Sequence, residues 1–493
     1  MDFINNLVPA IQSLFSFTPL LLVFIGICIG IMGGAIPGIS PSMAVALLLP
    51  LTYSMSATNA LLILMGIYIG ANYGGSITAV SINTPGTPSA TVTSFDGYPM
   101  AKSGKGGEAM GISLWASVFG GVIGTLILIF ASRPLARLAL QFWPSEYFAL
   151  CVMGLTTVAT LGGKHWQKAM VCVLFGLLLN TMGLAPITAV KRFTFGINHL
   201  YDGITFVPAL IGLFALSEVF SSLEAYQPKE EKSEKASYTW PKFKYYWSLK
   251  WSIIRSGVLG TVVGVFPGAG GTIASFLAYD MEKRISKHPE TFGKGAPEGV
   301  CAAEAANSSS VGGAMVPLLA LGIPGSATAA VLLGALMIHN LTPGPELFIK
   351  EPVMINTLFL SMFVANVFMA GIGTLGSKLW VRVTNIPKTI LLPLIFTFSI
   401  LGSYSVSQSM TDVIICLIFG VMGWLMKKYQ YPAAPIVLGL VLGKLIEANF
   451  HRAMTLNGLA SFTRPLTLAL FGISLLAIVF PLIQDRKKKK KSV

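Results

Sequence analysis

The chain has 493 residues, of which 54% are hydrophobic and only 11% are charged, and its mean hydropathy is +0.72. Soluble domains carry about 25% charged residues, so this composition excludes an ordinary soluble protein and predicts an all-α polytopic membrane protein. The net charge is +14, but an unbroken basic run occupies residues 486–491, which is typical of a cytoplasmic tail and not of a nucleic-acid-binding surface.

Residues 1–220 are predicted to form a first membrane repeat. The stretch Phe3–Phe95 contains no Asp, Glu, Lys or Arg, and no basic residue opens the chain, so we interpret the start as membrane domain and not as a signal peptide. Charge-free windows follow at Ala109–Ser132 and Ala169–Val190. Each window is long enough to cross a bilayer as a helix.

Residues 221–250 are rich in charge and are predicted to be a polar, cytoplasmic connector. Residues 251–484 form the predicted second membrane repeat, and residues 485–493 form a basic tail on the cytoplasmic side. Charge-free windows in this half lie at Pro352–Ser377, Thr389–Thr411 and Pro465–Gln484. With shorter and interrupted segments added, the sequence predicts roughly 10 to 13 transmembrane or re-entrant helices.

The two halves share a pattern of glycine and proline that interrupts apolar segments. "YGGSITAVSINTPGTPSAT" (73–91) resembles "VGGAMVPLLALGIPGSAT" (311–328). A second pair of breaks lies at residues 36–44 and 266–274. Its matched positions are Gly30, Gly34, Pro37, Gly38 and Ala44 in the first half and Gly260, Gly264, Pro267, Gly268 and Ala274 in the second. Two ordered pairs of matches indicate an internal repeat.

Basic residues in the loops predict that the two repeats have opposite orientations. Leu51–Ala57 has no basic residue, whereas the equivalent Glu282–Gly299 has several. The order reverses after the other motif, where Asp96–Glu108 carries lysines and His339–Lys350 has only its terminal lysine. Because cytoplasmic loops are enriched in Lys and Arg, these contrasts predict inverted-topology repeats with Gly/Pro-broken helices, as in many secondary transporters.

Broken helices inside a membrane leave backbone groups that need a cavity, a neighbour or a ligand. Their N-terminal N–H groups suit an anion, glycine permits close approach, and Ser and Thr add donors. Close helix packing by small residues is the alternative explanation. No Lys or Arg lies in the four breaks, so backbone, hydroxyl and amide groups would bind the anion. The candidate substrate-binding residues are Ser40, Ser42, Asn83, Thr84, Gly86, Thr87, Ser89, Gly268, Thr272, Gly325, Ser326 and Thr328.

A co-bound cation or a coupling proton would need its own ligands. Glu304, Asn307 and Asn72 are the candidates, because carboxylates inside a membrane are costly and often functional. Asp280 and Glu298 are expected to be merely solvated at the edges of a loop. The scattered cysteines predict no disulfide framework or zinc site, and no other cofactor is expected.

The chain resembles the large membrane subunit of the tripartite tricarboxylate transporter family (TctA type). Three long stretches carry the resemblance: "GANYGGSITAVSINTPGTPSATVTSFDGYPMAK" (70–102), "FPGAGGTIASFLAYDMEKRISKHPETFGKGAPEGVCAAEAANSSSVGGA" (266–314) and "LGIPGSATAAVLLGALMIHNLTPGPELF" (321–348). Family members typically read "EAANN" where this chain has Ser308, which weakens any role transferred to that position.

The resemblance implies a bacterial inner-membrane carrier for di- and tricarboxylates such as citrate, driven by a Na⁺ or H⁺ gradient. It also implies two partners, a small membrane subunit and a periplasmic solute-binding protein. A stand-alone carboxylate carrier remains open, as does an anion channel lined by re-entrant half-helices. HExxH, GxSxG and Walker A patterns are absent, so the sequence does not predict an enzyme.

Overall fold

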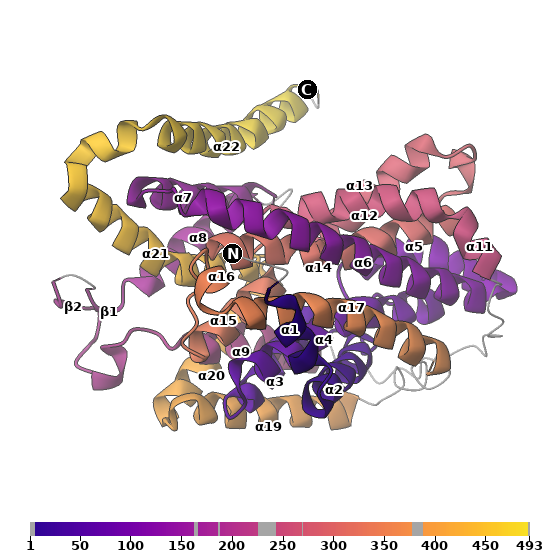
Figure 1. The fold of residues 1–493 in the computed structure, drawn as a ribbon, viewed down its shortest axis with the longest axis horizontal. Helices are drawn as coiled ribbons and strands as arrows, with labels where there is room; N and C mark the ends of the chain where they lie inside the picture. Colours follow the sequence, from indigo (N-terminus) through magenta and orange to yellow (C-terminus); the bar gives the residue numbers. More distant parts are fainter. Residues whose placement is uncertain are drawn as a thin grey trace.

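The computed structural model describes residues 5–161, 166–185, 188–224, 243–268, 270–376 and 388–491, and these residues are mainly helical (Figure 1). The helices before the connector are α1 (Leu7–Leu14), α2 (Phe17–Gly34), α3 (Pro41–Leu48), α4 (Ala57–Ile82), α5 (Ala90–Met100), α6 (Gly106–Ala139), α7 (Pro144–Leu161), α8 (Trp166–Asn180), α9 (Phe206–Ile211) and α10 (Ser217–Glu224). Strands β1 (Gly183–Leu184) and β2 (Lys191–Arg192) pair antiparallel between α8 and α9, with Gly183 opposite Arg192.

The second half repeats this helical character. Its helices are α11 (Phe243–Ser248), α12 (Lys250–Val265), α13 (Gly270–Ile285), α14 (Pro297–Leu321), α15 (Ala327–Ile338), α16 (Leu347–Lys350), α17 (Pro352–Leu375), α19 (Lys388–Ser407), α20 (Met410–Lys428), α21 (Ala433–Asn457) and α22 (Pro465–Lys491). Most of the predicted connector, residues 225–242, lies outside the described residues.

Eight described helical segments are long and apolar enough to cross a membrane. They are Phe17–Gly34, Ala57–Ile82, Ala90–Ala139, Phe206–Glu224, Pro352–Leu375, Thr389–Ser407, Met410–Lys428 and Ala433–Thr463. Four shorter apolar helices accompany them: Pro41–Thr52, Trp166–Asn180, Ala327–Ile338 and Pro465–Val479. The predicted all-α polytopic class is confirmed, whereas the inverted orientation of the repeats stays a prediction.

Two sequence predictions of local structure are wrong. The window Ala169–Val190 does not form one helix, because α8 ends at Asn180 and Gly183, with a φ of 112°, turns the chain into the β1–β2 hairpin. The segment Asp96–Glu108 is not a loop, because α5, a π-helical turn and the start of α6 cover it. Gly104, with a φ of 82°, interrupts the helix there. Hydropathy and charge do not detect either change of backbone conformation.

Rows of glycine explain how the helices before and after the breaks pack. In the first half, a Cβ added at Gly30 or Gly70 would lie closer than 3.0 Å to a carbonyl of the facing helix, because α2 and α4 touch along their backbones. In the second half, Gly260 and Gly313 place α12 equally close to α14. Gly30 and Gly260, which the sequence comparison matches, therefore have the same packing role in the two halves.

Helix α14 lies at the centre of the molecule, between α6 and α12 (Figure 1). Nearly all its residues are buried. Gly120 and Gly124 of α6 lie against the backbone of Ala305 and Ser309. A helix of the second half is thus enclosed by helices of both halves, which places Glu304 and Asn307 in the interior.

Candidate functional site at the broken helices

Each glycine-proline motif forms a turn between two helices, as the sequence predicts. The turns connect α2 with α3, α4 with α5, α12 with α13, and α14 with α15. Two of the long helices end in the same way, since Asn83 closes α4 with a φ of 55° and Gly322 closes α14 with a φ of 75°. Asparagine tolerates this left-handed conformation, so the end of α4 explains why Asn83 stands here. Its side chain, predicted to be a ligand, is exposed.

The glycines of two turns occupy equivalent places in the two halves. Gly86 packs against the carbonyl of Gly34, and Gly325 packs against the carbonyl of Gly264. An added Cβ would lie less than 3.0 Å from the carbonyl oxygen in both cases. Close packing, the alternative that the sequence left open, therefore applies to these two positions whether or not a ligand lies near them.

Two backbone N–H groups in the predicted anion site form hydrogen bonds with carbonyl groups of the protein. The N–H of Gly86 donates to the carbonyl of Gly75 at 3.1 Å. The N–H of Gly268 donates to the carbonyl of Gly325, also at 3.1 Å, which joins the α12–α13 turn to the α14–α15 turn. Gly268 and Gly325 thus hold two predicted parts of the site together instead of both facing a ligand.

The α14–α15 turn also contacts the first half of the chain. Ser326 caps α15 by accepting the N–H of Ala329 at 3.1 Å, and its hydroxyl lies 3.0 Å from the hydroxyl of Tyr68 on α4. Among the described residues, none accepts a hydrogen bond from the N–H of Ala327 or Thr328. Thr328 is buried, and buried N–H groups without a protein acceptor are usual where water or a ligand binds.

The hydroxyl groups of the first half mostly bond within their own turns. Ser40 caps α3 by accepting the N–H of Met43 at 3.2 Å, and its hydroxyl lies 3.0 Å from that of Ser42. The hydroxyls of Thr87 and Ser89 lie 3.1 Å apart.

The remaining two threonines differ from each other. Thr84 donates to the carbonyl of Ile82 at 3.3 Å. Thr272 is half-buried, and among the described residues no group forms a hydrogen bond with its hydroxyl. No hydrogen bond between described residues joins the α4–α5 turn to the α14–α15 turn. These two predicted parts of the site are therefore linked through α4 and not directly.

Glu304 is fully buried and lies where three helices meet. Its carboxylate accepts hydrogen bonds from Thr93 of α5 and from Ser117 of α6, the latter at 3.0 Å. No Lys, Arg or His among the described residues forms an ion pair with it. A buried carboxylate without a cationic partner among the described residues needs a proton or a cation to balance its charge.

Asn307, one turn further along α14, bridges the two halves. Its amide nitrogen donates to the carbonyl of Asn72 at 3.3 Å, while its buried amide oxygen has no hydrogen-bond partner among the described residues. A Cβ added at Gly271 would meet this oxygen, so the amide points toward the start of α13, one residue before Thr272. The three predicted cation ligands therefore lie next to one another, although Asn72 contacts Asn307 through its backbone carbonyl and not through its side chain.

A second group of unpaired oxygens lies beside Asn307. Ser308 and Asn366 line a small cavity with Gly121, and the Ser308 hydroxyl and the Asn366 amide oxygen are both buried without a hydrogen-bond partner among the described residues. Ser308 is where the sequence departs from the family pattern. Unpaired buried oxygens in a cavity are typical sites for water or a small cation.

The structure also separates the acidic residues at the loop edge from this interior. Asp280 is exposed and pairs with Arg284 at 2.7 Å, as expected for a solvated carboxylate, and Glu298 is half-buried. Sequence reasoning missed Tyr68, Thr93 and Ser117, which contact predicted site residues. Tyr68 lies one helical turn before Asn72, so the spacing of the two polar residues on one helix face could have indicated it.

Sequence reasoning also missed Asp96, which is fully buried. Its carboxylate accepts the N–H groups of Gly293, Gly295 and Ala296, each at 2.8 Å, and the hydroxyl of Tyr279 at 2.8 Å. The available signal was its position as the first charged residue after a long uncharged stretch.

Comparison with known proteins adds to this geometry. The family model described as tripartite tricarboxylate transporter TctA family matches residues 20–438. An Agrobacterium vitis protein named "Uncharacterized 52.8 kDa protein in TAR-I ttuC' 3'region" is 36% identical over 496 residues, covering 100% of this chain and 99% of that protein. Another from the same organism, "Uncharacterized protein in TAR-II ttuC' 3'region", is 33% identical over 237 residues, covering 48% of this chain and 98% of its own length. No solved structure matches the chain.

Proposed function

Because the chain belongs to the tripartite tricarboxylate transporter TctA family, we propose that it is the large membrane subunit of a secondary active transporter that imports small organic anions. The substrates are di- or tricarboxylates such as citrate, and a Na⁺ or H⁺ gradient drives their uptake. A periplasmic solute-binding protein delivers the anion, and a small membrane subunit completes the carrier. The family assignment and the apolar helices support a multi-pass protein of the bacterial inner membrane.

The observation that carries the proposal is the α14–α15 turn. Two first-turn N–H groups of α15 have no acceptor among the described residues, and Ser326 reaches Tyr68 of the other half. A helix N-terminus with unpaired N–H groups attracts a carboxylate, and a site built from both halves changes when the halves move. We therefore place the anion against Ser326 and Thr328, with Thr272 and the first-half turns nearby.

In this proposal, the coupling ion or proton binds at Glu304 and Asn307 in the interior of the protein. Glu304 balances its charge with either a proton or a cation, and the unpaired amide oxygen of Asn307 supplies a further cation ligand. Oxygen ligands of this kind suit Na⁺ as well as a relayed proton. Because Asn307 points toward α13 beside Thr272, binding there is coupled to the backbone around the anion.

The orientation of the chain is part of the same proposal. The basic tail and the connector face the cytoplasm, because both are rich in basic residues. A cysteine placed at Lys488 is then expected to react with a membrane-impermeant reagent only after the cells are opened. Rapid labelling in intact cells would reverse the orientation.

Uptake by proteoliposomes that contain the complete system tests the function. A panel of radiolabelled C4 to C6 carboxylates, citrate among them, is offered with Na⁺ and pH gradients imposed separately. We expect one acid to accumulate against its gradient, only in the presence of the solute-binding protein, and to exchange in counterflow. Flux without trans-stimulation would indicate a channel, and full uptake without partners would indicate a stand-alone carrier.

Replacement of the coupling residue is the second arm of this experiment. Glu304→Gln keeps the shape of the side chain but removes its charge, so we expect gradient-driven accumulation to disappear while counterflow persists. Glu346→Gln is the matched control, because that carboxylate is exposed and pairs with Lys350. Normal accumulation by the Glu304→Gln protein would remove Glu304 from the coupling step.

A further inference from the structure

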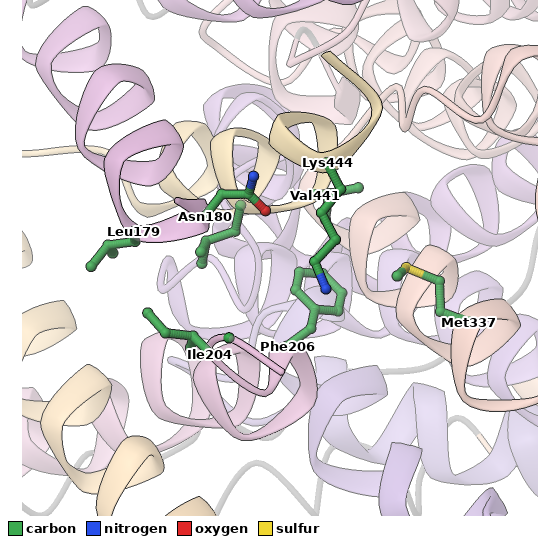
Figure 2. A pocket seen from close by; sticks show the side chains of 9 residues that line it. Leu179, Asn180, Ile204, Phe206, Met337, Val441 and Lys444 are labelled. Carbon is green, nitrogen blue, oxygen red and sulfur yellow. The ribbon is translucent and has the colours of Figure 1, made fainter. Parts of the chain in front are cut away.

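Two cavities of the protein differ in whether their polar groups have partners. The larger one lies between α8, α9, α15 and α21, and Figure 2 shows Asn180 and Lys444 on its wall. Lys444 is exposed, so water solvates its ammonium group. With its amide oriented to satisfy both groups, Asn180 bonds the backbone of α21 at 3.0 Å and 3.1 Å. The polar groups of this pocket are therefore satisfied without a ligand.

The smaller cavity lies between α4, α6, α14 and α17 and contains two oxygens without a partner. Its lining residues are Ile69, Gly121, Ser308, Val311, Met362 and Asn366, and all six are buried. Among the described residues, no group forms a hydrogen bond with the Ser308 hydroxyl or the Asn366 amide oxygen. An unpaired buried polar group is costly, so two such groups in one cavity indicate a bound species.

The geometry of Asn366 determines what the cavity can bind. Its amide nitrogen donates to the carbonyl of Met362 at 2.7 Å, which leaves the amide oxygen for the cavity. A Cβ added at Gly121 would collide with that oxygen, so glycine provides the space in which it lies. Hydroxyl and amide oxygens are ligands of hard cations. The cavity measures about 10 Å³, at the lower limit for a water molecule, and Na⁺ is smaller than water.

A negative charge close to the cavity favours a cation over water. Ser117 of α6 donates to the carboxylate of Glu304 at 3.0 Å. Further along both helices Gly124 lies against Ser309, so α6 and α14 run side by side in the same direction. Ser308 lies one helical turn beyond Glu304, about 6 Å along the axis. At this distance in a buried environment, an ionised carboxylate without a cationic partner among the described residues attracts a cation.

We propose that the Ser308–Asn366 cavity binds a Na⁺ ion, with the Ser308 hydroxyl and the Asn366 amide oxygen as ligands and Glu304 as the nearby counter-charge. A single carboxylate suits a monovalent ion, and no group of three His, Cys, Asp or Glu that could hold a metal gathers within the described part of the chain. The site is separate from the position at Glu304 and Asn307, and the proposal rests on the transport function proposed above.

The position of the cavity relates the ion to the movement of the two halves. Helices α4 and α6 belong to the first half, and α14 and α17 belong to the second. An ion that binds all four helices in one arrangement stabilises that arrangement over others. Binding and release of Na⁺ at this cavity therefore favour different arrangements of the halves, as a coupling ion must.

Thermal unfolding of the purified full chain tests the site without requiring transport. NaCl is titrated over the millimolar range, while choline chloride, whose cation is too large for the cavity, keeps the ionic strength constant. We expect Na⁺ to raise the melting temperature of the wild type. Ser308→Ala and Asn366→Ala should each raise the Na⁺ concentration at half-effect roughly tenfold or more. Ser361→Ala is the control, because Ser361 is buried on α17 and donates to Leu358 of its own helix at 2.7 Å.

The melting temperature in choline chloride alone separates a ligand from a structural residue. Ser308 has no hydrogen bond to a described residue that alanine would remove, so Ser308→Ala should keep the wild-type melting temperature there and lose only the response to Na⁺. A lower melting temperature in choline with a wild-type response to Na⁺ would indicate a structural water and overturn the proposal.

Three further outcomes are decisive. Absence of a Na⁺ response in the wild type overturns the proposal. A response that Glu304→Gln removes but both cavity variants retain places the ion at Glu304 and Asn307, and overturns it as well. Absence of uptake by the wild type in proteoliposomes, with the Na⁺ response of the cavity intact, overturns the transport function instead.

Discussion

The turn between α4 and α5 and the turn between α14 and α15 share a sequence pattern but use their backbones differently. At the start of α5, the N–H groups of Ala90, Thr91 and Val92 donate to carbonyls of the turn itself. At the start of α15, Ser326 satisfies Ala329, while Ala327 and Thr328 have no acceptor among the described residues. The first turn is thus closed on itself and the second is open, which shows that a repeated motif does not imply two equal binding sites.

The glycines of the two turns are the strongest test of what the turns have in common. Gly86→Ala and Gly325→Ala each force a Cβ against a carbonyl of the preceding broken helix, so both should lower the free energy of unfolding by about 1–3 kcal/mol or more. Thermal unfolding of the purified variants measures the effect. Gly371→Ala is the control, because nothing lies within 4 Å of its added Cβ. A wild-type melting temperature in either turn variant would contradict the packing role.

This packing also determines what the sequence could and could not predict. The matched glycines, prolines and serines located all four turns correctly, because helix breaks depend on local backbone preferences that residue types reveal. The same residues could not show that Gly86 and Gly268 donate to protein carbonyls, since their acceptors Gly75 and Gly325 are brought to them by packing. Partners such as Tyr68 and Ser326 lie 258 positions apart in the chain, so only the folded arrangement identifies them.

Replacing one serine in each turn by alanine tests this difference between the two turns. Ser326→Ala removes a donor beside the unpaired N–H groups and should weaken the apparent affinity for the transported acid by about 1–3 kcal/mol, roughly ten- to hundredfold. Ser89→Ala should cost less, because that hydroxyl lies against Thr87 within its own turn. Uptake KM measures both. Tyr68→Phe separates loss of the helix contact from loss of a ligand donor, and a larger effect at Ser89 than at Ser326 would reverse the assignment.

The smallest expected effect concerns the residues that end α4 and α14. Asn83 and Gly322 both have left-handed backbone conformations, which glycine adopts without strain and asparagine tolerates. Asn83→Gly should change the free energy of unfolding by less than about 1 kcal/mol, whereas Gly322→Ala should lower it by about 1–2 kcal/mol. Denaturation of the two purified variants gives both values. Uptake KM is expected to stay unchanged in the Asn83→Gly protein, and an increase would return Asn83 to the binding site.

The buried carboxylate of Asp96 has a mechanical consequence for any such carrier. Helix α5 begins at the α4–α5 turn, and its Asp96 holds the loop at 293–296 and Tyr279 of α13 through four hydrogen bonds. If α5 slid past that loop, the Asp96 carboxylate and its donors would lose their hydrogen bonds while buried away from water. The cost would be far above thermal energy. We therefore expect the start of α5 and the α13–α14 corner to move together, and the hinges of a transport cycle to lie outside them.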